Sequence, residues 1–239
     1  MGYRKHKVIA HRGASGKAPE NTLAAMKLAG ELGADMIETD IRTTEDGELI
    51  VMHDAEVDRT TDGSGPVSGM TLEQLRTLDA GSWFGPEFRE EKVPTLEEAL
   101  KEAKEAGCDL CIEIKEADPL RAIEKSREAG YADRIYLFDF DHPRLYRAKE
   151  AEPGIRALAL GVSPRNLDSL DTSKCNVAGV SFRDVDDALV RFLHGLGMSV
   201  FTYTVDDPED MHALIKMGVD AIITNYPSRA LELLDLQLE

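Results

Sequence analysis

The sequence predicts an α/β protein of the (β/α)8 barrel (TIM barrel) class, with a small insertion after the second barrel strand. Short apolar, β-branched stretches alternate with amphipathic helical stretches along the 239 residues. Eight such units fit a closed barrel of parallel strands better than an open sheet. No Pro-, Gly- or Ser-rich linker or abrupt change of composition divides the chain. We therefore expect a single domain over residues 1–239.

The predicted barrel strands share a content of apolar and β-branched residues that suits a strand buried on both faces. They comprise residues 7–10, 36–41, 109–114, 134–138, 156–160, 177–181, 198–203 and 220–224.

Capping signals mark the helices between these strands. Asn21 and Thr22 precede the stretch LAAMKLAGEL, and we interpret Asn21 as its N-cap. Asp207-Pro208 opens a later helix and Pro227-Ser228 opens the last one. Helices commonly end at a residue with a left-handed backbone conformation, which glycine adopts easily. Glycine follows five of the helical stretches: Gly33, Gly107, Gly130, Gly197 and Gly218.

The insertion begins after the second strand. The turn signal at residues 44–47 predicts that residues 48–52 return as a strand beside the second barrel strand, which brings His53 to the mouth of the barrel. Residues 54–94 then contain several Gly and Pro, a short helix near 71–78 and the pair Trp83-Phe84, before Thr95 caps the next helix. Segments of this length are commonly functional, so we interpret 54–94 as an insertion or rim within the domain.

Composition excludes several classes of protein. The net charge of −17 disfavours nucleic acid and anionic membranes as partners. No apolar stretch approaches the ~20 residues of a membrane-spanning helix, so no stable membrane insertion is expected. The basic start MGYRKHK is followed by an apolar run too short for a signal peptide, and no export signal is predicted.

Three cysteines, Cys108, Cys111 and Cys175, argue against a disulfide framework and for a reducing compartment, so we expect a cytoplasmic protein. Cys108 and Cys111 match the C-x-x-C spacing of redox and zinc sites. They open a strand rather than a helix and have no second pair downstream, which favours two buried thiols.

Ionisable residues gather where the first strands end. Glu38 and Asp40 lie two apart on one strand, as do Glu113 and Lys115 on the next, so each pair shares a face. In this fold the C-terminal ends of the strands form the active site. Three further ionisable residues follow strands directly: His11, Arg12 and His53.

Oxygen ligands from three carboxylates, Glu38, Asp40 and Glu113, favour Mg²⁺ or Ca²⁺, with Mn²⁺ as a further candidate, over zinc. Without a cation these carboxylates would repel one another, and one would hold a proton. With a cation, Arg12 and Lys115 make the site positive, as binding of an anionic phosphodiester requires. His11 and His53 could then exchange protons as acid and base.

The ordered motifs are similar to those of the glycerophosphodiester phosphodiesterases, a family of phospholipase C-like barrels. They are His11-Arg12-Gly13, Ala18-Pro19-Glu20-Asn21-Thr22, Glu38-Thr39-Asp40, the turn at residues 44–47 leading to His53-Asp54, and Glu113-Ile114-Lys115.

The resemblance covers nearly the whole chain and implies metal-dependent hydrolysis of glycerophosphodiesters to glycerol 3-phosphate and an alcohol. It implies three metal ligands (Glu38, Asp40, Glu113), a general acid and base (His11, His53), phosphate or metal-site partners (Arg12, Lys115) and supporting residues (Glu20 in the site wall, Asn21). In the implied mechanism one histidine deprotonates the glycerol 2-hydroxyl, which attacks phosphorus, and the other protonates the leaving alcohol. Direct attack by water is a second route.

Two positions depart from the family pattern. Many members carry Trp where this chain has Tyr203, and Asp where it has Asn225. We expect Tyr203 to form an aromatic wall for the glycerol moiety, with altered polarity because of its hydroxyl. These departures put substrate preference in doubt.

Two alternatives stay open. A lysophospholipid phosphodiesterase (lysophospholipase D-like) of the same fold should expose an apolar surface beside the site, for which only Trp83, Phe84 and Met70 provide a signal. A non-catalytic barrel that binds a phosphorylated metabolite is disfavoured by the intact set of histidines and carboxylates. Either a monomer or a homodimer is compatible with the sequence.

Overall fold

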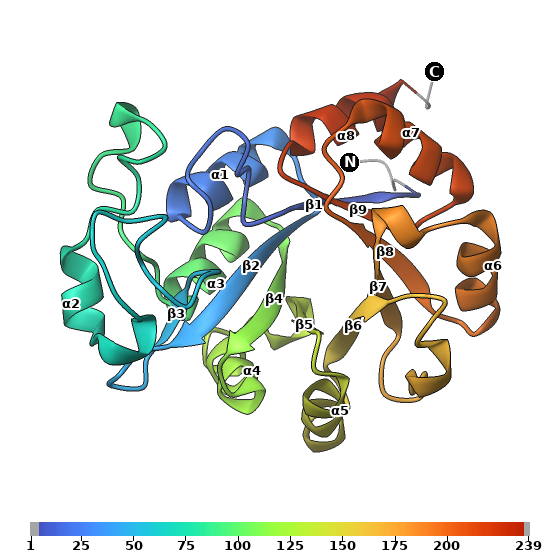
Figure 1. The fold of residues 1–239 in the computed structure, drawn as a ribbon, viewed down its shortest axis with the longest axis horizontal. Coiled ribbons are helices and arrows are strands. Elements are labelled where there is room, and N and C mark those ends of the chain that lie inside the picture. Colours follow the sequence, from blue (N-terminus) through green and yellow to red (C-terminus); the bar gives the residue numbers. More distant parts are fainter. Residues whose placement is uncertain (1–4, 237–239) are drawn as a thin grey trace.

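The computed structural model describes residues 5–236, and within them eight parallel strands close into a barrel (Figure 1). The barrel closes because β1 pairs with both β2 and β9. The bounds of each predicted strand differ by at most two residues from those of an observed strand. The predicted fold class is thereby confirmed. Residues 1–4 of the basic start lie outside the described part. The barrel strands are β1 (Lys7–Ala10), β2 (Met36–Thr43), β4 (Asp109–Glu116), β5 (Ile135–Asp139), β6 (Arg156–Val162), β7 (Val177–Ser181), β8 (Ser199–Tyr203) and β9 (Ala221–Thr224).

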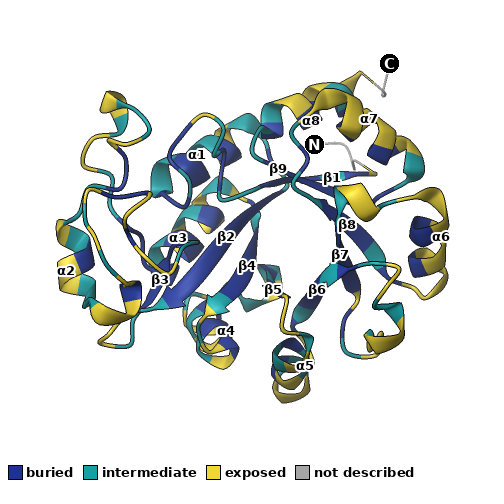
Figure 2. Ribbon diagram, viewed as in Figure 1, coloured by how far each residue is buried: buried dark blue, intermediate teal, exposed yellow. Residues whose placement is uncertain are grey.

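Helices surround the barrel with their apolar faces inward, and their exposed faces form the outer surface (Figure 2). Except for α2, which belongs to the insertion, each helix connects successive barrel strands or follows the last one. The helices are α1 (Leu23–Leu32), α2 (Leu72–Thr77), α3 (Leu96–Ala106), α4 (Pro119–Glu128), α5 (His142–Ala151), α6 (Asp187–Gly195), α7 (Pro208–Met217) and α8 (Pro227–Asp235).

The predicted cap of α1 is wrong by one residue. Thr22 is the N-cap, and its hydroxyl accepts a hydrogen bond from the backbone N–H of Ala25 at 3.2 Å. Asn21 has a left-handed φ of 57° and turns its side chain into the barrel, where it donates to Asp40 at 2.9 Å. The other signals are confirmed, including the capping box of Thr95 with Glu98 and a positive φ at all five predicted helix-end glycines.

The barrel interior changes from apolar to charged along its axis. Alternation along β2 points Met36, Glu38 and Asp40 to the same inner face. Met36 packs in an apolar cluster that fills the interior below the mouth, whereas the two carboxylates lie nearer the C-terminal ends of the strands. The other members of this cluster are Ile9, Cys111, Phe138, Leu158, Leu160, Val177, Phe201, Ala221 and Ile223.

The strand after the turn, β3 (Leu49–Val51), pairs antiparallel with β2, as predicted, and leads directly to His53. Residues 54–94 follow it at the side of the barrel (Figure 1). Five of their buried apolar residues pack with Ile50 and Met52, which precede the segment, in a small cluster apart from the main core, and Met70 packs against this cluster. Trp83 donates from Nε1 to the carbonyl of Ala80 at 2.9 Å and packs edge-on against Phe84.

All three cysteines are free and buried. Burial raises the pKa of both Cys108 and Cys175 to about 11, and the Cys111 thiol lies in the barrel interior, 3.8 Å from the sulfur of Met36. Thiols in such surroundings are unreactive, which supports the interpretation of Cys108 and Cys111 as buried thiols. Among residues 5–236, no helix is long and apolar enough to cross a membrane.

Candidate active site

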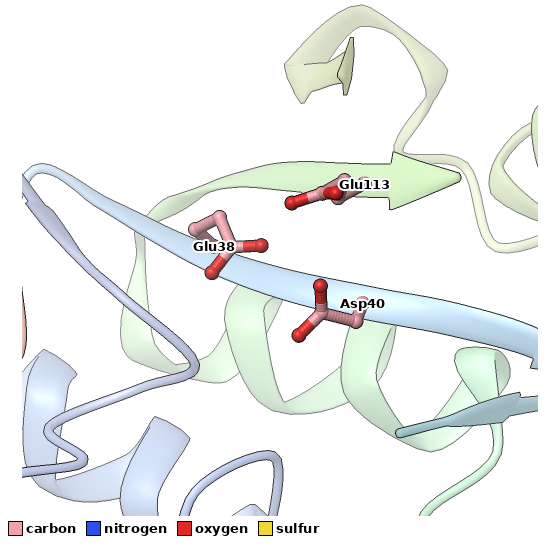
Figure 3. A group of neighbouring side chains, drawn as sticks. All are labelled: Glu38, Asp40 and Glu113. Atoms are coloured by element: carbon pink, nitrogen blue, oxygen red, sulfur yellow. The ribbon is translucent and has the colours of Figure 1, made fainter. Parts of the chain in front are cut away.

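Three carboxylates meet inside the mouth of the barrel (Figure 3). Pairing of β2 with β4 sets Asp40 beside Glu113, and Glu38 lies two residues before Asp40 on the same face. All three side chains are buried, and one oxygen from each lies within 4.8 Å of the others. Glu38 Oε1 and Asp40 Oδ1 are buried and accept no hydrogen bond from any described residue. Such close, oxygen-only donors fit a divalent cation.

Burial and mutual repulsion give these carboxylates different protonation states. Burial, followed by the charges of Asp40 and Glu113, raises the pKa of Glu38 well above its ordinary value. The same causes, with Asp40 as the charged neighbour, raise the pKa of Glu113 to about 7. Burial also opposes ionisation of Asp40, but Arg12 and Lys115 hold the pKa of Asp40 below its usual range. Without a cation, the cluster therefore retains protons near neutral pH.

Two positively charged side chains border the carboxylate cluster. Arg12 Nε lies 3.3 Å from Asp40 Oδ2, and its Nη1 donates to Glu20 at 2.7 Å. Lys115 Nζ lies 3.3 Å from Asp40 Oδ1 and also donates to Glu113. Positive charge thus stands beside the predicted ligands, at the place where the resemblance implies a phosphate.

The glycine after Arg12 is a packing requirement. Gly13 has a φ of 81°, and a Cβ there would come within 2.6 Å of the Ala25 backbone in α1. This close approach lets the chain turn sharply after β1. It leaves the backbone N–H of Arg12 to donate to Glu38 Oε2 at 2.9 Å.

His11 is oriented by a polar chain that starts after β9. Asn225 Nδ2 donates to Asp206 Oδ2 at 2.7 Å, so its Oδ1 faces His11 Nδ1, also at 2.7 Å. An amide oxygen only accepts hydrogen bonds, so Nδ1 of His11 carries the proton. Its Nε2 then has a free lone pair and lies 3.9 Å from Glu38 Oε2. Burial, with Arg12 nearby, lowers the pKa of His11 to about 4, so this ring is neutral at pH 7.

His53 has a charged partner instead. Its Nδ1 lies 2.6 Å from Asp54 Oδ1, and Asp54 also accepts from Arg59 at 2.6 Å. Hydrogen bonds from Arg59 and His53 outweigh burial and hold the pKa of Asp54 below its usual range, so the partner of His53 is ionised. Arg59 also donates to Glu20 at 2.8 and 2.9 Å, which links the loop after β3 to the loop after β1.

Sequence reasoning missed Arg42 and the role of Asn225. Arg42 is buried, and its Nε and Nη2 donate to the carbonyl of His53 at 2.9 and 2.7 Å. Arg42 follows Asp40 by two residues, so the alternation that revealed the carboxylates also contained its signal. No local pattern pairs Asn225 with His11, because β1 and β9 lie at opposite ends of the chain.

The remaining predicted residues divide between two cavities. Tyr203, with His11 and two of the carboxylates, lines a cavity of about 30 Å³. The Tyr203 hydroxyl accepts a hydrogen bond from the backbone N–H of Gly161 at 3.1 Å, so this hydroxyl is bonded to the protein itself. Glu20 and Asn21 line a second small cavity together with His53. Both cavities border the carboxylate cluster, because Glu38 lines the first and Asn21 donates to Asp40.

Fold and site together define a (β/α)8 barrel with a buried cluster of three carboxylates that could hold a cation, beside two histidines with different hydrogen-bond partners. Residues 11–229 match the model of the glycerophosphoryl diester phosphodiesterase family. The chain belongs to this family. The predicted resemblance and the predicted enzyme class, a phosphoric diester hydrolase, are thereby confirmed.

Individual relatives agree over nearly their whole length. A glycerophosphodiester phosphodiesterase of Caldanaerobacter subterraneus is 39% identical over 236 residues, which cover 95% of this chain and 96% of the relative. One from Bacillus subtilis is 33% identical over 245 residues, covering 92% and 83%. Among solved structures, a phosphodiesterase of Oleispira antarctica, in complex with the product sn-glycerol-3-phosphate, superposes with a TM-score of 0.88 at 32% identity and covers 96% of each chain.

Proposed function

We propose that this protein hydrolyses glycerophosphodiesters to glycerol 3-phosphate and an alcohol in a reaction that requires a divalent cation and two histidines. The observation that carries the proposal is the cluster of three buried carboxylates, bordered by Arg12 and Lys115 at the barrel mouth. Family membership and the product found in the Oleispira antarctica relative support the substrate class.

The cation would be held by Glu38, Asp40 and Glu113, whose donor set fits Mg²⁺ or Ca²⁺, with Mn²⁺ as a further candidate. The buried Oε1 of Glu38, which accepts no hydrogen bond from a described residue, supports this fit, because a buried carboxylate oxygen without a donor is costly unless a cation binds it. When bound, the cation neutralises charge on the phosphate oxygens. Arg12 and Lys115 add donors for the same oxygens.

We assign His11 as the general base. Its Nδ1–H donates a hydrogen bond to the neutral amide of Asn225. Its Nε2 lone pair borders the cavity that Glu38, Glu113 and Tyr203 line. The pKa of about 4 keeps this nitrogen free to accept a proton at neutral pH.

We assign His53 as the general acid. The ionised Asp54 accepts from its Nδ1 and stabilises a positive ring, while Arg42 holds its backbone. The other nitrogen of the ring can then donate its proton to a leaving oxygen.

These roles give a balanced reaction. His11 takes the proton of the glycerol 2-hydroxyl, and that oxygen forms a bond to phosphorus while the bond from phosphorus to the alcohol oxygen breaks. The departing oxygen takes its proton from His53. The product of this step is a cyclic phosphate. A water then attacks phosphorus and gives a proton to His53, and the ring oxygen that leaves takes a proton from His11, which yields glycerol 3-phosphate and restores both histidines.

We further propose a cytoplasmic location. Three free, buried thiols support it, because proteins of oxidising compartments usually pair their cysteines.

The test is release of glycerol 3-phosphate from glycerophosphocholine and glycerophosphoethanolamine by metal-stripped protein, before and after addition of Mg²⁺, Ca²⁺ or Mn²⁺. We expect turnover only with metal, and neither metal binding nor turnover in the Glu113→Ala variant. The matched control is Glu102→Ala on the exterior helix α3, which should behave as wild type. Folded protein that is silent with all three metals contradicts the proposal, and turnover of lysophosphatidylcholine in that case would indicate a lysophospholipid phosphodiesterase.

A further inference from the structure

Phe140 is an exposed aromatic ring that the protein holds in a fixed place beside the site. It follows β5 directly and is 55% exposed. Its ring meets that of Tyr203 edge-on, with centroids 6.1 Å apart and an interplanar angle of 89°. Gly161 has a φ of 72°, and a Cβ there would come within 3.1 Å of the Phe140 ring. Because Tyr203 also binds the Gly161 N–H, these three residues form one packed unit.

This unit separates two cavities. Phe140 and Leu160 line the small inner cavity that contains His11 and Glu113. The same two residues line an open outer groove of about 370 Å³, which therefore adjoins the inner cavity. The other residues of the groove are His142, Pro143, Tyr146, Gly161, Asn166 and Ser169.

The groove offers aromatic faces and little hydrogen bonding. None of its lining residues is Asp, Glu, Lys or Arg. Asn166 uses its amide on the backbone of Gly161 and Ser163, at 2.8 Å each, and Ser169 donates to the carbonyl of Asn166.

Its two other polar side chains are also engaged by the protein. Nε2 of His142 lies 2.7 Å from the carbonyl of Leu160, and the Tyr146 hydroxyl accepts from the backbone of Asp171 at 3.0 Å. The two rings lie side by side with centroids 6.0 Å apart. A ligand in this groove therefore meets mainly rings and aliphatic groups.

We infer that this groove binds the alcohol end of the diester and favours an alcohol that carries a quaternary ammonium group, such as choline. The inference rests on the proposed function. An N-methylated cation has no N–H to satisfy and is attracted to the faces of rings such as Phe140 and Tyr146. A primary ammonium brings three donors that need acceptors. The smaller inner cavity, beside His11 and Tyr203, then takes the glycerol end.

The chain's charge favours the same ligand. A net charge of −17 draws a cationic alcohol toward the protein. Two carboxylates of the neighbouring strands are committed elsewhere, since Asp139 is paired with Arg144 at 2.6 Å and Glu113 belongs to the proposed cation site, whereas Asp141, between Phe140 and His142, is exposed. The lining of the groove itself offers rings and no charged side chain.

The experiment compares kcat/KM for glycerophosphocholine and glycerophosphoethanolamine, with metal present. We expect wild type to prefer glycerophosphocholine, and Phe140→Leu to reduce that preference about threefold, mainly through KM, as loss of a cation–π contact at an exposed site implies. Phe140→Tyr, which keeps the ring, should retain the preference. Phe192→Leu on α6 removes an equally exposed ring outside both cavities and should behave as wild type.

An unchanged preference in Phe140→Leu overturns the inference, as does an equal loss for both substrates. Saturation-transfer NMR with choline chloride tests the groove without turnover. Transfer from wild type to the methyl protons, lost in Phe140→Leu, supports the groove even if no diester is hydrolysed and the proposed function fails. Absence of transfer in wild type, or turnover of lysophosphatidylcholine faster than glycerophosphocholine, overturns it.

Discussion

The two halves of the barrel mouth carry different kinds of side chain, charged in one half and aromatic in the other. The half formed by β1 to β4 carries Glu38, Asp40 and Glu113, each of which affects the ionisation of another. The half formed by β5 to β8 carries Phe140 and Tyr203, which contact each other through their rings. A charged site needs exact protonation states, whereas discrimination between similar alcohols needs shape and a ring face. The difference suggests that chemistry and substrate preference can be altered separately in this protein.

Within the charged half, the two histidines also differ from each other, in their hydrogen-bond partners. His11 faces a neutral amide and His53 faces an ionised carboxylate. Their distinct partners, rather than their positions along the chain, are the basis on which we propose His11 as the base and His53 as the acid.

The largest expected effect comes from removing either histidine. His11→Ala and His53→Ala should each lower kcat by about three orders of magnitude, because proton transfer contributes roughly 10² to 10⁴ in rate. Circular dichroism and thermal unfolding should show an intact fold. The matched control is His212→Ala on the exposed face of α7, which should keep wild-type kinetics. Near-wild-type rates in either active-site variant would overturn the role of that histidine.

A second test concerns pH and the cation. The pKa of Glu113 is raised from 4.5 to about 7, so the metal-free native state binds more protons than the unfolded chain between these values. Its stability therefore falls as the pH rises from 4.5 to 7. A cation needs the ionised carboxylate, so Mg²⁺ affinity should rise over this range by about tenfold per pH unit for one displaced proton.

Calorimetric titrations with Mg²⁺ at pH 5.5, 6.5 and 7.5 measure this dependence. Glu113→Gln removes one titrating group and should weaken the dependence, while Glu38 keeps part of it because its pKa is also raised. An affinity that does not change with pH would show that Glu113 is already ionised in the metal-free protein.

The smallest expected effect comes from the partner of His11. Asn225→Asp places a carboxylate against Asp206, so we combine it with Asp206→Asn, which preserves the hydrogen bond between the two side chains. An anionic partner stabilises the protonated His11, so the rise of kcat/KM with pH should move to higher pH by about one unit. The Asp206→Asn variant alone is the control. An unmoved profile in the double variant would separate Asn225 from the protonation of His11.

Much of the charged half was predictable because its signals are local. Strand alternation placed Glu38 with Asp40, and positions directly after strands revealed His11 and His53. The same alternation contained Arg42, which was missed because no chemistry was assigned to it. The cap of α1 was misassigned because Asn and Thr are both good N-caps. Only the left-handed backbone of Asn21 shows which one turns inward.

The aromatic half was hardly predictable. Tyr203 was expected as a wall, but nothing in the sequence indicated that its hydroxyl binds Gly161 or that Phe140 packs across both. These residues lie on three different strands or their ends, and their contacts depend on strand order and register.

By itself, the sequence determined the eight-unit barrel, the inward carboxylates and the family, because periodicity and motif order are properties of neighbouring residues. The tertiary structure alone decided that Asp40 lies beside Glu113, that Asn225 orients His11, and that Phe140 lies between the inner cavity and an outer groove. Those facts depend on closure of the barrel, which brings β9 against β1 and sets the register of every strand pair. Contacts between distant segments exist only after that closure.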